Sequence, residues 1–167
     1  MELLIVVTII GVVYNLAVSN FQRIGQEEQK VTLKTLKEYM QNIPHEKSVK
    51  FLCLDDCSSC DLFIDGDKRR DLSGVFDEFI DDSIKVYTYD YSLGMSLKRD
   101  DVYFNEENVE EEVCFSYEID KKGVGEQVFI EFKDKIYDFT TYLIPTQTFA
   151  TLEDAVEDKE RLVVELR

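Results

Sequence analysis

Four cysteines have the most distinctive spacing in this chain of 167 residues. Cys53, Cys57 and Cys60 form the pattern C-x3-C-x2-C, and Cys114 stands apart in a segment of alternating apolar residues. Thiols at such spacing could form disulfides, bind a metal ion or carry redox chemistry. The even number favours structural disulfides, in a body that is exported to an oxidising compartment. Four cysteines allow three pairings, and the sequence does not choose among them.

Metal and redox interpretations of the same cysteines fit less well. C-x3-C-x2-C matches the cluster motif of radical enzymes that use S-adenosylmethionine, but this chain is short for such a barrel and has no glycine-rich cofactor segment after the motif. A four-cysteine zinc site is an alternative, although its spacing departs from common structural zinc patterns and one ligand is distant. The C-x2-C segment at 57–60 would suit a thioredoxin-like site, but no βαβ pattern surrounds it.

A group of aspartates is the candidate cation site. Asp65 and Asp67 flank a glycine, and Asp61 and Asp71 lie on either side of them, which hints at a calcium loop. The group lacks the ligand order of an EF-hand and its closing glutamate. A solvated hairpin turn is the preferred interpretation, with calcium as the alternative.

The remaining ionisable residues do not suggest catalysis. His45 is the single histidine, which excludes sites built on paired histidines. No nucleophile motif such as G-x-S-x-G occurs. The acidic run at 106–112 is expected to be a solvated loop, with a cation site or a surface for a basic partner as the alternative. We therefore predict no enzyme and no cofactor other than the calcium hypothesis.

Charge divides the chain into two parts. The sequence has 35 Asp and Glu against 19 Lys and Arg, a net charge of −16. The first 44 residues carry four acids and four bases, so the whole net charge belongs to residues 45–167. Such an acidic body is repelled by phosphates, and direct nucleic acid binding is not expected. We predict a neutral segment at 1–44 and an acidic globular domain at 45–167.

The neutral segment begins with an uncharged apolar run from Leu3 to Val18. The run is shorter than the roughly 20 residues of a membrane-spanning helix. An amphipathic pattern follows from Asn20, and Pro44 would end it. The pattern predicts one helix from about residue 2 to about 42, roughly 60 Å long. A domain of the remaining size could not cover such a helix. Its first half is therefore expected to lie in a membrane or against other copies of itself.

The residues from Glu2 to Val12 read ELLIVVTIIGV, and this run resembles the N-terminus of type IV pilins and type II secretion pseudopilins. The resemblance covers about the first 40 residues. The family's basic leader, its first Phe and the two residues after it are missing here, and Met1 stands just before the family's Glu. We expect that the chain is trimmed or that its translation start lies upstream.

This resemblance implies a structural subunit of a type II secretion, DNA-uptake or type IV pilus machinery. Within that class a minor pseudopilin is the favoured interpretation. It would sit in the inner membrane with its globular domain in the periplasm, and its partners would be other pilin-like subunits. Glu2 would pair with the N-terminal ammonium of a neighbouring subunit, because a buried charge is tolerable when paired. The membrane helix would contain Leu3, Leu4, Ile5, Val6, Val7, Ile9, Ile10, Gly11, Val12 and Val13. The alternative is a single-pass anchored periplasmic domain that binds a ligand or senses redox state.

Alternating apolar residues predict a mainly antiparallel sheet in the acidic domain. The expected strands lie at 48–54 and 61–65, which form a hairpin, at 84–89, near 102–104, and in a three-stranded meander at 113–119, 128–132 and 136–144. The rest of 92–112 is expected to be loop. A short helix is expected at 71–82, and another from about 151 to 162 with Thr151 as its N-cap. A long helix followed by such a sheet is an α+β fold.

Overall fold

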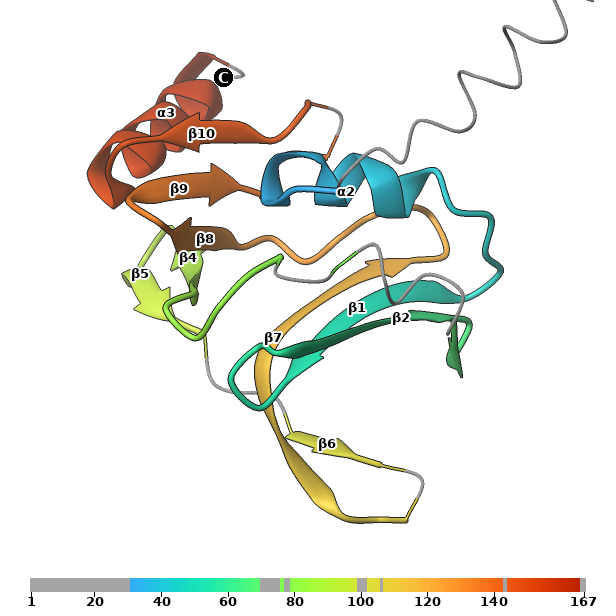
Figure 1. Ribbon diagram of the computed structural model, residues 1–167. Coiled ribbons are helices and arrows are strands. Elements are labelled where there is room, and N and C mark those ends of the chain that lie inside the picture. The colour runs from blue at the N-terminus through green and yellow to red at the C-terminus, as the bar shows by residue number, and fades with distance from the viewer. Residues whose placement is uncertain are drawn as a thin grey trace, which may run out of the picture. The chain divides into compact units, whose positions relative to one another are not determined.

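The computed structural model describes residues 31–69, 76, 79–98, 102–105, 107–142 and 144–165. This part of the chain is mostly antiparallel β-structure with two short helices (Figure 1). In chain order the elements are α2 (Leu33–Gln41), β1 (Ser48–Leu54), β2 (Ser59–Ile64), β3 (Asp67–Lys68), β4 (Lys85–Asp90), β5 (Gly94–Leu97), β6 (Val102–Phe104), β7 (Glu110–Asp120), β8 (Phe129–Phe132), β9 (Lys135–Asp138), β10 (Gln147–Phe149) and α3 (Leu152–Glu165).

The strands form two five-stranded sheets. The first has the order β3-β2-β1-β7-β6 and the second β10-β9-β8-β4-β5. Alternation along each strand decides which side chains enter the core. In β1, for example, Val49, Phe51 and Cys53 are buried, while Lys50 between them is only half-buried.

One large core cluster draws its side chains from α2 and from both sheets. Leu36 and Met40 of α2 are fully buried in it. Phe51 also belongs to this cluster, and its ring centroid lies 4.8 Å from that of Phe76 and 6.0 Å from that of Phe115. Burial of this apolar surface is the main stabilising term of the body.

The predicted continuous helix from about 2 to 42 is wrong, and so is the α+β class built on it. Thr32 is extended, with φ −127° and ψ 164°, and α2 begins only at Leu33. The N–H of Thr32 donates to Oγ1 of Thr35 at 3.0 Å, as in a capping box. The apolar spacing continues across this cap, so periodicity alone does not reveal the break. Residues 1–30 lie outside the described part of the chain.

The predicted three-stranded meander is also wrong in its pairing. The β8–β9 hairpin is present, with Lys133 and Asp134 at its turn in left-handed backbone conformations. β7 instead pairs with β1 and β6, in the other sheet. Beyond Asp120, whose carboxylate accepts the N–H groups of Lys122 and Val124, β7 meets the following segment in one bridge, Ile119 to Gly125. The chain then crosses to the second sheet.

Other local predictions are confirmed. β1 and β2 form the expected hairpin, β4 and β6 lie where strands were predicted, and the Thr151 hydroxyl caps α3 by accepting the N–H of Asp154 at 3.1 Å. The prediction of loop for most of 92–112 is wrong, because β5 and the start of β7 lie there. The predicted helix at 71–82 falls mostly outside the described residues. Within the described part, neither helix has the length and apolarity needed to cross a membrane.

Candidate functional site

The proposed assembly residues belong to the segment outside the described part of the chain. Glu2 and the apolar residues from Leu3 to Val13 all lie there, so their roles stay predictions. The structure does describe how the chain enters the body. Val31, Leu33, Leu36 and Met40 are all buried, so one face of α2 and the residue at the start of the described chain pack into the core.

Lys37 is a buried residue that the sequence pattern did not single out. It is 2% exposed, and its Nζ donates to the carbonyl oxygens of Thr141 at 2.8 Å and Ile144 at 2.9 Å. Burial lowers the pKa of Lys37, against the opposing effect of the Asp138 carboxylate. These bonds attach α2 to the segment that precedes β10. A charged residue on a helix normally lies at the surface, so no local signal marks this one.

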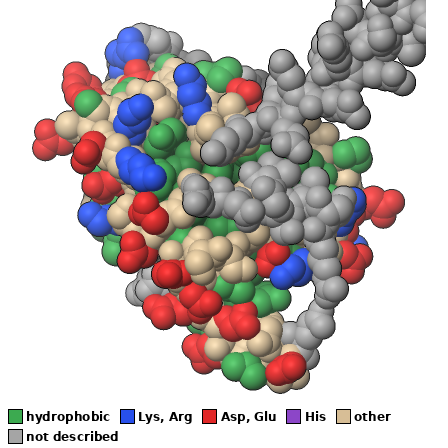
Figure 2. Space-filling model, viewed as in Figure 1, with side chains coloured by type: hydrophobic (Ala, Val, Ile, Leu, Met, Phe, Trp, Pro, Cys, Tyr) green, Lys and Arg blue, Asp and Glu red, His purple; other side chains and the backbone are tan. Residues whose placement is uncertain are grey.

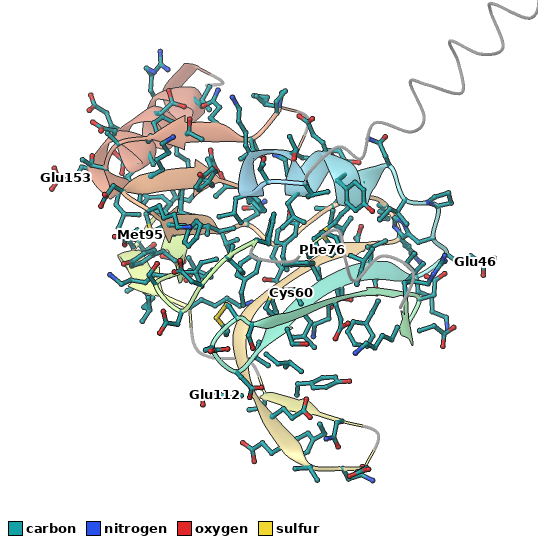
Figure 3. The ribbon with its side chains drawn as sticks, viewed as in Figure 1. Glu46, Cys60, Phe76, Met95, Glu112 and Glu153 are labelled. Atoms are coloured by element: carbon teal, nitrogen blue, oxygen red, sulfur yellow. A yellow bond between two sulfur atoms is a disulfide. The ribbon has the colours of Figure 1, made fainter. Side chains whose placement is uncertain are left out.

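All four cysteines are joined in disulfides, Cys53 to Cys60 and Cys57 to Cys114. The first bridge joins directly opposed residues of the β1–β2 hairpin, and the second joins the hairpin loop to β7. Figure 3 labels Cys60 beside this hairpin. The prediction of disulfides is confirmed, and the structure supplies the pairing. Cys53, Cys57 and Cys60 are at most 9% exposed, which suits structural bridges better than a redox-active pair.

The candidate calcium ligands have other partners or lie apart. Asp65 accepts hydrogen bonds from the backbone N–H groups of residues 46–48, and these bonds, above all that from Lys47, hold the pKa of its carboxyl below the usual value. Asp61 forms an ion pair with Lys68, at 2.6 Å. Asp67 is exposed, and Asp71 falls outside the described residues. Nowhere among the residues that the structure describes do three potential ligands converge on one point.

His45 links two segments of the body through both of its ring nitrogens. Nδ1 lies 2.7 Å from the carbonyl oxygen of Ile43, and Nε2 lies 3.0 Å from that of Asp120. Both partners are acceptors, and only the protonated ring can donate to both at once. These two bonds, the stronger to Ile43, therefore raise the pKa of His45, with help from the carboxylates of Asp65 and Asp120.

We expect NMR titration of the full chain to give His45 a pKa above its ordinary value of about 6.5. Because the folded pKa is raised, the ring's contribution to stability is complete below about pH 6.5 and is lost as the pH rises through the folded pKa. His45→Gln should remove this part of the pH dependence of unfolding. A His45 pKa at or below 6.5 would contradict the two-acceptor geometry.

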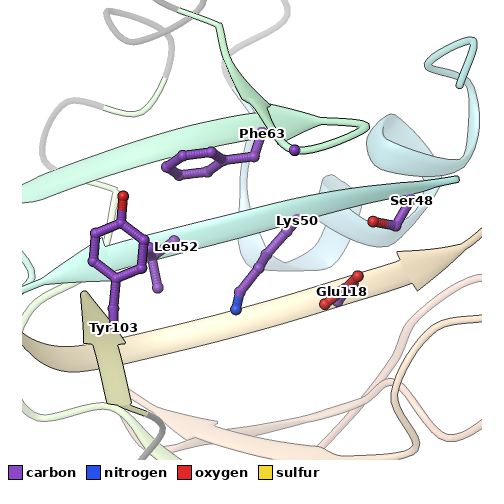
Figure 4. A pocket seen from close by; sticks show the side chains of 7 residues that line it. Ser48, Lys50, Leu52, Phe63, Tyr103 and Glu118 are labelled. Carbon is purple, nitrogen blue, oxygen red and sulfur yellow. The ribbon is translucent and has the colours of Figure 1, made fainter. Parts of the chain in front are cut away.

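A small cavity lies on the outer face of the first sheet. It has a volume of about 170 Å³ and is lined by the side chains drawn in Figure 4. Lys50 and Glu118 stand opposite each other across β1 and β7, and the rings of Phe63 and Tyr103 lie 6.1 Å apart. Its one base and one acid offset each other, so the cavity has no marked charge preference.

A larger cleft, about 530 Å³ in volume, lies between the β4–β5 hairpin and α3. Tyr89 and Met95, which are opposed across the hairpin, line it from the sheet side. Leu152 and Val156 line it from the helix side. Figure 3 labels Met95 and Glu153 on this side of the body. The remaining lining residues are Tyr91, Gly94, Glu153, Glu157 and Glu160.

The cleft exists because α3 covers only part of the second sheet. Ala155 of α3 is buried with Phe129 and Ile136, on β8 and β9, and the helix contacts β9 and β10. The β4–β5 side of the same sheet is therefore not closed over by the helix. Thr151 predicts the start of α3 as its N-cap, but a local pattern cannot show which strands a helix will cover.

Acidic side chains line the helix side of the cleft. Glu160 accepts a hydrogen bond from the Tyr89 hydroxyl at 2.5 Å, and this bond, with burial and nearby carboxylates, raises the pKa of Tyr89 to about 12. Lys159 is not among the residues that line the cleft, and its Nζ lies 5.7 Å from the centre of the Phe129 ring. The described residues that line the cleft thus include three carboxylates and no base.

The acidic run predicted as a solvated loop is instead part of a hairpin. Glu110, Glu111 and Glu112 open β7, opposite β6. Figure 2 shows acidic side chains gathered where this hairpin projects from the body.

Comparison with known proteins adds no relative: no family model, no curated protein and no solved structure matches this chain.

Proposed function

We propose that this chain is a pilin-like structural subunit, which assembles with similar subunits through its apolar N-terminal segment. The uncharged run from Leu3 to Val18, with Glu2 before it, is the observation that carries the proposal. Apolar surface of this extent is unfavourable in water, and lipid or other apolar segments would bury it. The subunit belongs among the minor pseudopilins or minor pilins in this proposal, with the inner membrane as its site of residence.

The two disulfides support an extracytoplasmic body. Disulfides form and persist in the periplasm and outside the cell, and are rare in the cytoplasm. Cys57–Cys114 joins the β1–β2 hairpin to β7 across 57 residues of sequence, so it closes a long loop of the chain. A domain with two such bridges suits a subunit whose body lies outside the cytoplasm.

The packing of α2 into the core supports a firm attachment of the N-terminal segment to the body. Leu33, Leu36 and Met40 enter the core, and Lys37 holds two backbone carbonyl groups beyond β9. Force applied to the preceding segment would act on this helix and on the core around it. A sensor domain on a flexible tether would not need a helix packed into its core at this point.

Glu2 has the role that can be tested most directly. A carboxylate within an apolar bundle costs several kcal/mol unless a positive charge pairs with it. The N-terminal ammonium of a neighbouring subunit is the partner that the pilin resemblance implies. Pairing at this point would set the axial position of one subunit against the next.

We expect Glu2→Ala to reduce crosslinking between subunits at least about tenfold, because it leaves the partner ammonium unpaired. The full chain would be expressed with a basic leader that ends in Gly, followed by Phe-Thr-Leu directly before Met1. A photo-crosslinking amino acid would replace Val6. Crosslinked multimers in membranes would be measured by immunoblotting. Glu2→Gln should behave like Glu2→Ala, because it keeps the shape and loses the charge.

Glu38→Gln is the matched control, because Glu38 is an exposed carboxylate on α2. It should leave the multimers unchanged. The absence of reactive thiols would show that each variant has folded, since both bridges form in the folded body. Undiminished multimers in folded Glu2→Ala, or a wild-type chain found with reduced thiols outside the membrane fraction, would refute the proposal.

A further inference from the structure

We propose that the cleft between the β4–β5 hairpin and α3 binds an arginine or lysine side chain from a peptide segment of a partner protein. The cleft belongs to the body, and its role does not depend on how the N-terminal segment assembles. Its volume of about 530 Å³ lies in the range of pockets that hold specific ligands.

The charge of the cleft selects a basic occupant. Glu153, Glu157 and Glu160 follow one another at helical spacing along α3, and all three are exposed. Glu153 lies in the first turn, where the helix dipole favours a carboxylate, whereas Glu157 and Glu160 lie beyond it. Like charges three and four residues apart repel each other on a helix. A bound cation would relieve this repulsion.

No base is among the described residues that line the cleft beside these carboxylates. Lys159 lies over the Phe129 ring, and Arg161 pairs with Asp158. The net charge of −16 adds a long-range field that attracts positively charged segments.

The other walls of the cleft suit the stem and the planar head of such a side chain. The rings of Tyr89 and Tyr91 lie 5.2 Å apart at 81°, so they present differently oriented faces and edges. Guanidinium and ammonium groups are attracted to aromatic faces. Met95 and Val156 supply the apolar surface against which an aliphatic stem packs.

The exposed surface beside the cleft favours a peptide over a free ion. Tyr91, Leu93 and Leu97 belong to the same hairpin and are 62%, 89% and 61% exposed, respectively. They offer contacts to apolar residues that flank the base in a partner segment. A metal ion would instead need converging ligands, and the described carboxylates do not converge.

Peptide binding to the full chain in neutral detergent tests the proposal. The probe is a fluorescent peptide, Gly-Leu-Arg-Arg-Leu-Gly, and its partner replaces both arginines by citrulline, which is similar in shape and uncharged. We expect anisotropy to report binding of the arginine peptide, at least about tenfold tighter than the citrulline peptide and weaker at higher salt. Glu157→Gln with Glu160→Gln should weaken it about tenfold, and Tyr91→Ala about threefold.

The control removes the same number of negative charges from a surface outside the cleft. Glu107→Gln with Glu110→Gln removes two exposed carboxylates near the β6–β7 hairpin and should leave affinity nearly unchanged. Glutamine at 160 can still accept the Tyr89 hydrogen bond, so the cleft keeps its shape. Circular dichroism would confirm that each variant is folded. Equal weakening by the control pair, equal binding of the citrulline peptide, or no binding of the arginine peptide would each overturn the proposal.

Discussion

Replacing Cys57 and Cys114 together by alanine is expected to lower the free energy of unfolding by about 4 kcal/mol. The bridge joins residues 57 positions apart, so its removal frees a long loop in the unfolded chain. Cys57 is also 4% exposed, and truncating it leaves unfilled space in the core. Urea unfolding of the full chain in neutral detergent, followed by circular dichroism, would measure the loss.

The other bridge provides a matched control for the same chemistry. Cys53 and Cys60 are only seven positions apart and already face each other in a paired hairpin. Loop-closure entropy grows with loop length, so replacing this pair by alanine should cost about 2.5 kcal/mol. Equal losses from the two double variants would contradict the entropic account. A peptide map joining 53 to 57, or 60 to 114, would contradict the pairing itself.

Gly125→Ala is expected to destabilise the body by about 3 kcal/mol, because the added methyl group has no space. A Cβ at this position would lie 1.9 Å from the Tyr117 hydroxyl oxygen and 2.6 Å from the ring carbon that bears it. Tyr117 is fully buried, and its ring lies 4.8 Å from that of Phe139, so it has little room to retreat. Thermal or urea unfolding would measure the effect.

Tyr117→Phe separates this steric cost from the chemistry of the hydroxyl. The hydroxyl is buried and has no hydrogen-bond partner within the described structure. Removing it alone should therefore stabilise the body by up to about 1 kcal/mol. Combined with Gly125→Ala, it should recover part of the loss, since the nearest clashing atom is gone. Unchanged stability of Gly125→Ala, or no recovery in the double variant, would show that Tyr117 does not set the limit at this position.

Local sequence patterns determined the elements whose signals lie within a few neighbouring residues. The alternation in SVKFLCL marked β1 at its observed bounds, and Thr151 with Asp154 marked the start of α3. The even number of cysteines indicated disulfides before any pairing was known. Each of these signals can be read without knowing the fold. Alternation and a helix cap depend only on neighbouring residues, and the number of cysteines is a property of the composition.

Only the tertiary structure decided the partners of these elements. β7 pairs with β1 rather than β8, and Cys57 reaches Cys114, because strands and thiols far apart in sequence meet only after the chain has folded. Thr32 is extended and stands at the N-cap of α2, and the apolar spacing that predicted one long helix passes over it unchanged. Lys37 is charged yet buried, because two backbone carbonyl groups from beyond β9 accept its hydrogen bonds. The cleft beside α3 likewise depends on which strands the helix leaves uncovered, and no local pattern contains that information.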